Sequence, residues 1–219
     1  MKKGLTELVF ILDRSGSMSG LEKETIGGYN STLDRQKNEK GEACVSTVLF
    51  DNEMEVLHDR IPIQNVVPLT EKQYYARGST ALMDAIGRAI HHIGNVHKYA
   101  REEDRPEKTI FVITTDGYEN DSHEYSIQQV QSMIKRQKEK YGWEFLFLGA
   151  NIDAIKTAES IGIHSSRAAN FIADEEGVEK MYEAQEMLLC DIRQNRATAS
   201  DDSWKRNLED DYMKRKKRG

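Results

Sequence analysis

The chain has 219 residues, of which 38% are hydrophobic and 31% are charged, and its net charge at pH 7 is −6. This length suits one domain with a short extension, and a chain of this size can bury a core without disulfide or metal staples. No segment approaches the roughly 18 consecutive apolar residues that a membrane-spanning helix needs, so we expect no membrane segment.

The cysteines and the N-terminus indicate a cytoplasmic protein. Cys44 and Cys190 are the only two cysteines and are far apart in sequence, which does not fit a disulfide framework. We interpret them as reduced thiols in or near the core. The apolar run Leu8–Leu12 is too short for a secretory signal, and it continues into Asp13 without a small-residue cleavage site.

Apolar runs alternate with amphipathic segments along the chain. Leu5–Asp13 is almost continuously apolar, as expected for a strand covered on both faces. Leu21–Lys40 is predicted to be a helix, although Gly27 and Gly28 weaken that prediction. Ala43–Asp51, rich in Val, Thr and Leu, predicts the second strand.

The third strand is expected at an edge of the sheet. Asp51-Asn52 is a turn signal, so Met54–Pro62 is predicted to pair with the second strand as a hairpin. Pro62 and Pro68 favour an edge position, because proline cannot donate a hydrogen bond to a neighbouring strand.

Strands and helices continue to alternate in the second half. Helical spacing of apolar residues or short apolar runs define each element. In chain order we predict a helix over Ala81–Glu103, a strand over Lys108–Thr115, a helix over Ser126–Tyr141, a strand over Trp143–Gly149, a helix over Ala154–Ile161, an edge strand over Ala168–Ile172 and a helix over Asp174–Arg196. The pattern predicts a doubly wound, Rossmann-like α/β fold. Its six-stranded sheet is mostly parallel, with one antiparallel edge strand and helices on both faces.

Residues 1–196 are predicted to form one domain, and residues 197–219 a charged tail that is ordered only in part. The run Lys214–Arg218 carries five positive charges, and without it 26 basic residues face 37 acidic ones. That acidic body argues against nucleic acid as a partner of the domain. The run itself could contact nucleic acid or an acidic partner, although a solvated tail is the simpler interpretation.

Short polar side chains gather where the strands are predicted to end. Asp13-Arg14-Ser15-Gly16-Ser17 follows the first strand, Thr115-Asp116-Gly117 ends a later one, and Gly78-Ser79-Thr80 opens a long helix. Ligands of doubly wound sheets bind at the carboxyl ends of the strands, so these segments are expected to meet. Oxygen ligands suit a hard cation such as Mg²⁺, Mn²⁺ or Ca²⁺, and the absence of Cys and His in these loops argues against zinc. We predict one divalent metal at a site made of Asp13, Ser15, Ser17, Thr80 and Asp116.

These motifs resemble the metal-ion-dependent adhesion site of von Willebrand factor A and integrin inserted domains, most of all the intracellular bacterial members. The resemblance covers about residues 5–195 and extends to Phe50-Asp51-Asn52-Glu53 and to the segment that begins at Thr80. It implies that the hydroxyls of Ser15, Ser17 and Thr80 bind the metal, and that Asp13 and Asp116 bind it directly or through water. The remaining position would take a Glu or Asp from a partner protein.

The resemblance implies a protein-binding module rather than an enzyme, with a partner in an ATPase-associated or stress-response complex. The alternative is a Mg²⁺-dependent phosphoryl-transfer hydrolase, which a doubly wound fold permits. Position 15 is Ser where the commonest aspartyl-phosphate arrangement has Asp, and no activated nucleophile with a partner histidine is evident.

Two further features stay open at this stage. Asp84 lies one turn past Thr80 and either supports the metal ligands or stabilises the helix N-terminus. Glu119, Asn120 and Asp121 either face the metal or form a solvated loop.

Overall fold

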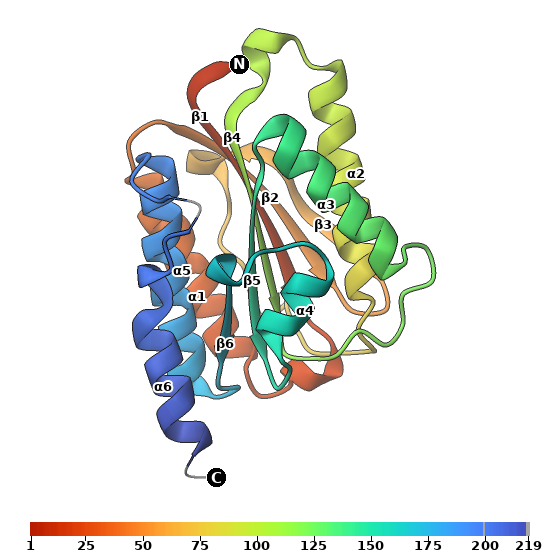
Figure 1. Cartoon of the computed structure of the whole chain (residues 1–219), viewed down its shortest axis with the longest axis vertical. Coiled ribbons are helices and arrows are strands. Elements are labelled where there is room, and N and C mark those ends of the chain that lie inside the picture. Colours follow the sequence, from red (N-terminus) through yellow and green to blue (C-terminus); the bar gives the residue numbers. More distant parts are fainter. Residues whose placement is uncertain (199, 218–219) are drawn as a thin grey trace.

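A six-stranded sheet with the order β3-β2-β1-β4-β5-β6 lies at the centre of the computed structural model (Figure 1), which describes residues 1–198 and 200–217. The strands are β1 (Lys2–Asp13), β2 (Glu42–Phe50), β3 (Met54–Pro62), β4 (Pro106–Thr115), β5 (Glu144–Ala150) and β6 (Ala168–Phe171). All neighbouring strands are parallel except β2 and β3. The predicted mostly parallel sheet with one antiparallel edge strand is therefore confirmed.

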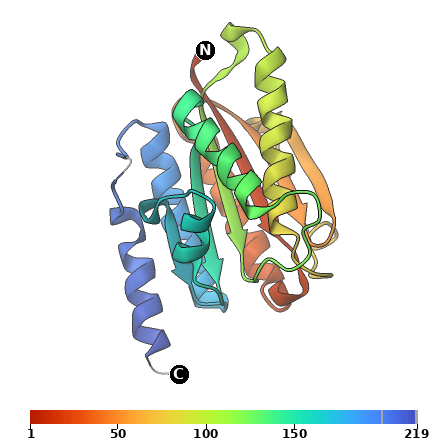
Figure 2. The ribbon, with the colours of Figure 1, turned by 45° about the vertical axis from the view of Figure 1, so that its right-hand side comes forward.

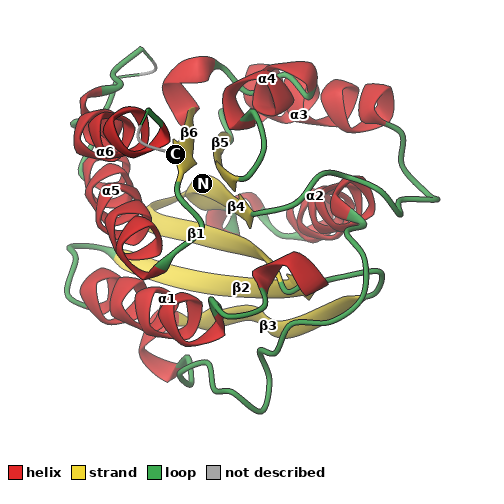
Figure 3. Cartoon of the chain, turned by 90° about the horizontal axis from the view of Figure 1, so that it is seen from below, coloured by secondary structure: helices red, strands yellow, loops and turns green. Residues whose placement is uncertain are grey.

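Helices cover both faces of this sheet (Figure 3). One layer contains α1 (Glu22–Lys37), α5 (Glu175–Arg193) and α6 (Arg206–Lys216), and the other contains α2 (Leu82–Tyr99), α3 (Ile127–Tyr141) and α4 (Ala154–Ser160). The central strand β1 shows why. Leu8 and Phe10 face the first layer while Val9 and Ile11 face the second, and all four are fully buried. A strand with two covered faces needs this continuous apolar run.

The C-terminal segment forms a helix that the sequence did not predict. Ala199, Arg218 and Gly219 of the predicted tail lie outside the described residues. A short 3₁₀ helix, η5 (Ser203–Lys205), leads into α6. Trp204 is buried, and its indole N–H donates to the carbonyl of Ser166 at 2.9 Å. Leu208 is buried in the same core layer. These two apolar residues dock a segment whose other side chains are mainly charged.

Two smaller predictions can be compared with the structure. Cys44 and Cys190 are both free and buried, as expected for reduced thiols, and burial raises the pKa of the Cys44 thiol to about 12. Within the described part of the chain, no helix is long and apolar enough to cross a membrane.

Candidate metal centre

Three loops meet beyond the carboxyl ends of β1 and β4, at the lower end of the molecule in Figure 1 and Figure 2. The backbone N–H of Gly16 donates to the carbonyl of Gly78 at 3.0 Å, and that of Arg77 donates to the carbonyl of Arg14 at 2.8 Å. These bonds hold the loop before α2, which carries Thr80, against the loop after β1. The five residues predicted as metal ligands are thereby brought together.

Asp13 is the last residue of β1 and is 1% exposed. One carboxylate oxygen, Oδ1, accepts the backbone N–H of Ser15 at 2.7 Å, and Oδ2 accepts the hydroxyl of Thr115 at 2.6 Å. Burial raises the pKa of Asp13 to about 6, although both hydrogen bonds oppose that rise. The Asp13 side chain is therefore held in one orientation, with both oxygens engaged.

Ser15, Ser17 and Asp116 form a chain of side-chain contacts. The two serine hydroxyls are 3.0 Å apart, and Ser17 donates to Oδ1 of Asp116 at 2.5 Å. The other Asp116 oxygen, Oδ2, is buried and has no hydrogen-bond partner among the residues that the structure describes. Burial raises the pKa of Asp116, against the effect of the Ser17 hydrogen bond. A buried oxygen without a partner is costly, so this oxygen is available as a ligand.

Gly117 marks the space between the hydroxyls. A Cβ atom at this position would lie 3.0 Å from Oγ of Ser17, 3.1 Å from Oγ1 of Thr80 and 3.9 Å from Oγ of Ser15. Three hydroxyl oxygens thus surround one small volume beside Asp116, and the exposed Ser17 opens it to solvent. Hydroxyl and carboxylate oxygens fit a hard divalent cation. In the described ranges no three or more His, Cys, Asp or Glu side chains cluster to hold a metal, so a metal here depends on the hydroxyls.

The loop after β4 positions Thr80. The backbone N–H of Thr80 donates to Oδ1 of Asn120 at 2.9 Å, and the Asn120 N–H donates back to the Thr80 carbonyl at 3.1 Å. Ser79 donates its hydroxyl to Asp121 at 2.5 Å, and Glu119 accepts the backbone N–H of Met83 at 2.9 Å. Residues 119–121 therefore fix the start of α2, which the solvated-loop interpretation did not anticipate.

Asp84 lies in the first turn of α2 and also has a role that the sequence did not predict. Its carboxylate accepts the backbone N–H groups of His123, Glu124 and Tyr125 at 2.8 to 2.9 Å. Burial alone would raise the pKa of Asp84, but these three hydrogen bonds outweigh it and hold the pKa below its usual range. Asp84 thus orders the loop between β4 and α3.

A charge cluster between the loops after β1 and β2 and the loop before α2 was not predicted from the sequence. Oδ2 of Asp51 accepts hydrogen bonds from Nε of Arg14 at 2.9 Å and from Nε of Arg77 at 2.7 Å. The backbone carbonyl of Asp51 accepts a hydrogen bond from the N–H of Ala81 at 2.9 Å. Asp51 therefore connects the loop of Ser15 and Ser17 to the loop of Thr80. Its place directly after β2, at the same sheet edge as Asp13, was the available signal.

A family model and several solved structures match the fold described above. The sequence model of the von Willebrand factor type A domain matches residues 7–184. Proximal thread matrix protein 1 from the mussel byssus, solved with a zinc-occupied metal-ion-dependent adhesion site, is 16% identical with a TM-score of 0.59, over 85% of this chain and 46% of that one. A von Willebrand factor type A protein from Catenulispora acidiphila is 14% identical with a TM-score of 0.51, over 89% and 42% of the two chains. A search of curated proteins found no match.

At these identities the solved structures show a shared fold. The chain spans less than half the length of both proteins. A third similar structure is a variant of the PilB minor pilin from Streptococcus sanguinis, which is 11% identical with a TM-score of 0.56, over 90% of this chain and 64% of that one. The match over residues 7–184 is broader evidence, because it includes five whole strands, the second half of β1 and all of the loops at the candidate site. The chain therefore belongs to the von Willebrand factor type A domain family.

Proposed function

We propose that Asp13, Ser15, Ser17, Thr80 and Asp116 hold one divalent cation in a metal-ion-dependent adhesion site, and that this site captures a Glu or Asp of a partner protein. Mg²⁺ is the expected metal, with Mn²⁺ and Ca²⁺ as alternatives, because every donor is a hydroxyl or carboxylate oxygen. A bound dication would supply the positive charge that attracts the partner's carboxylate.

One observation carries this proposal. The buried Oδ2 of Asp116 has no partner among the described residues, and the other oxygen of this carboxylate binds Ser17, one of the three hydroxyls within 4 Å of a Gly117 Cβ. Two carboxylates against one dication leave the site about neutral, so a third carboxylate from outside still gains a favourable interaction with the metal. The exposure of Ser17 leaves room for such a ligand to approach.

The geometry of Asp13 favours binding over catalysis. A phosphoryl-transfer hydrolase of the alternative type needs a carboxylate that attacks phosphorus. Asp13 is 1% exposed, and its two oxygens already accept hydrogen bonds from Ser15 and Thr115. We therefore propose that the chain acts as an interaction module and not as an enzyme.

The cellular setting is part of the same proposal and is supported only by the resemblance. It comprises a cytoplasmic, bacterial protein that works beside an ATPase-associated or stress-response complex. Von Willebrand factor type A domains mediate interactions between proteins, and the identity of the partner is the open question.

Calorimetric titration of the intact chain with MgCl₂, MnCl₂ and CaCl₂ tests the metal. Asp13→Ala should abolish binding, while Asp34→Ala, which removes a 73% exposed aspartate on α1, should not. Affinity purification from cell extract with Mg²⁺ or with EDTA then tests the partner. Partner capture that is indifferent to both EDTA and Asp13→Ala contradicts the proposal.

A further inference from the structure

The direction of α6 places its C-terminal turn at the same sheet edge as the candidate metal centre. At its start, Lys205 donates to the carbonyl of Ala168, the first residue of β6, at 2.9 Å. At its other end, Arg215 pairs with Asp174 and Glu176, which follow β6 in the chain. The helix therefore runs parallel to β6 and ends beyond the strand's carboxyl end, as the labelled helix in Figure 1 also shows.

Lys214, Lys216 and Lys217 form the basic end of α6, and all three side chains are exposed. The surroundings of Lys216 indicate which charged groups are near this end of the helix. Its hydrogen bond with Tyr212 is the main cause that raises its pKa, and the nearby Asp153 and Tyr118 add to the rise. Asp153 follows β5, and Tyr118 lies two residues after Asp116. The basic end of α6 is thus close enough to the loops after β5 and β4 for their charged groups to act on it.

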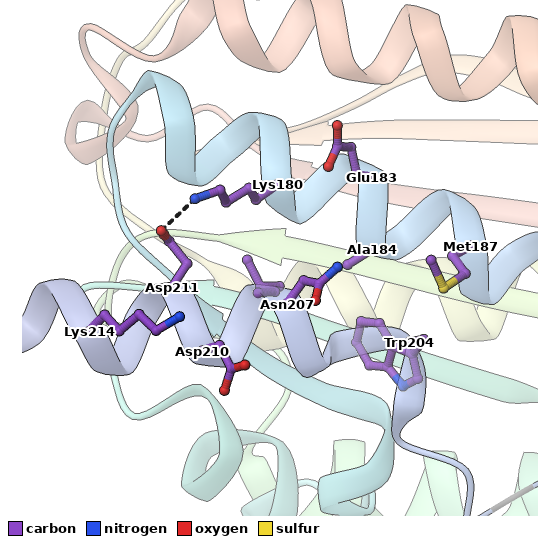
Figure 4. A pocket seen from close by; sticks show the side chains of 10 residues that line it. Lys180, Glu183, Ala184, Met187, Trp204, Asn207, Asp210, Asp211 and Lys214 are labelled. Carbon is purple, nitrogen blue, oxygen red and sulfur yellow. Dashed lines mark hydrogen bonds and ion pairs between the residues drawn. The ribbon is translucent and has the colours of Figure 1, made fainter.

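The neighbouring groove involves only one of these lysines, Lys214. It lies between α5 and α6 (Figure 4) and has a volume of about 350 Å³. Lys180 and Asp211 form an ion pair of 2.5 Å in it. Acidic side chains from both helices also line it, so the groove does not by itself select an anion. Lys216 and Lys217 lie past the groove, toward the strand ends.

Another group of positive charges lies at the opposite edge. Lys135, Arg136 and Lys140 are exposed near the C-terminal end of α3, which leads directly into the start of β5. The chain without its last basic run is acidic overall, with 26 basic and 37 acidic residues. The positive charge of the basic end of α6 therefore contrasts with the net negative charge of the rest of the protein.

We propose that the basic end of α6 is a second contact for the partner protein, whose ligand carboxylate is therefore accompanied by a cluster of acidic residues. The inference rests on the proposed function and adds the class of partner segment. Three strand spacings separate β1 from β6, or about 15 Å. Roughly five extended residues span that distance. The acidic cluster is expected about five residues from the ligand carboxylate.

Two labelled peptides test this with the full chain by fluorescence anisotropy in Mg²⁺ at low salt. The first has one Glu and, five residues away, a run of three Glu; the second has Ser in place of that run. The wild type should bind the first peptide about fivefold more tightly, because three exposed ion pairs each contribute modestly. The preference should shrink as salt rises.

Matched charge variants locate the effect. Lys214→Gln/Lys216→Gln/Lys217→Gln should abolish the preference for the acidic run, and Lys135→Gln/Arg136→Gln/Lys140→Gln should keep it. An unchanged preference in the first variant, or an equal loss in both, overturns the inference. Displacement of the acidic peptide by single-stranded DNA of equal charge at lower concentration also overturns it, in favour of a nucleic-acid surface.

Repeating the peptide titrations in EDTA separates this inference from the proposed function. If EDTA releases the Ser-substituted peptide, metal-dependent binding is supported. The lysine variants then test only the second contact at the basic end of α6. If that peptide binds equally in EDTA while the lysine variant still loses the preference, the metal-dependent function fails and the basic surface stands. Absence of binding by both peptides overturns both.

Discussion

Nε of Arg14 donates to Oδ2 of Asp51 at 2.9 Å, and the two side chains are 1% and 0% exposed. Burial would raise the pKa of Asp51, but hydrogen bonds from Arg77, the Glu53 backbone and Arg14 hold it below its usual range. The pair joins the end of β1 to the end of β2. Because Arg77 binds the same oxygen of Asp51, the loop that carries Thr80 is fixed to the same charge.

Asp51→Ala should therefore destabilise the protein by about 3 kcal/mol, since it removes the buried partner of the Arg14 Nε and leaves that buried charge only the half-exposed Glu55, 2.6 Å from Nη1. Urea denaturation measures the loss. The exposed pair formed by Asp34 provides the control, because Asp34→Ala should cost well under 1 kcal/mol. Equal losses in the free energy of unfolding for the two substitutions would show that the buried pair stabilises the protein no more than an exposed one.

Gly117→Ala should weaken Mg²⁺ binding by about tenfold or more, because the added methyl group enters the space between Ser17 and Thr80. The backbone at Gly117 is not in the left-handed region, so we expect little change in the free energy of unfolding. Calorimetric titration and thermal denaturation of the same sample separate the two effects. Gly94→Ala is the matched control, because a Cβ there meets only the end of the Gln137 side chain at 3.5 Å, and Mg²⁺ binding should be unchanged.

Acid should stabilise the metal-free protein in one window of pH. Burial raises the pKa of Asp13 from 3.8 to about 6, so the native state holds a proton that the unfolded state has released. This contribution is complete below the unfolded pKa and is lost as pH rises through about 6. It amounts to roughly 2–3 kcal/mol. Urea midpoints in EDTA across this range measure it, and Asp13→Asn should flatten the dependence.

Metal binding should show the opposite trend with pH. A cation competes with the proton on Asp13, so Mg²⁺ affinity should fall as pH drops below about 6. Calorimetric titrations at several pH values measure this. Affinity that stays constant through the titration of Asp13 would argue against Asp13 as a ligand.

Trp204→Ala should lower the free energy of unfolding by about 3 kcal/mol, because it removes a buried aromatic side chain and its hydrogen bond to Ser166. Met213→Ala, at a side chain that is 53% exposed on α6, should have little effect. If truncation after Arg196 leaves stability unchanged, the contacts of η5 and α6 do not contribute to the fold.

Local patterns along the chain were enough to predict the sheet and the candidate ligands. The apolar run that ends at Asp13 and the run that ends before Asp116 identify two parallel strands. Parallel strands share one carboxyl edge, so short polar residues after each strand meet without further information. Asp13, Ser15, Ser17, Thr80 and Asp116 could therefore be named from spacing and from the family resemblance, and whether they bind metal stays a prediction.

The sequence alone determined the succession of strands and helices as far as α5, and the candidate ligands at the strand ends, because those depend on periodicity within single segments. Only the tertiary structure decided how distant segments pair. The Arg14–Asp51 contact spans 37 positions, and the open oxygen of Asp116 is defined by what surrounds it. The docking of α6 depends on two apolar residues, Trp204 and Leu208, that fit a surface made by other elements. Such pairing reflects three-dimensional complementarity, which no local pattern encodes.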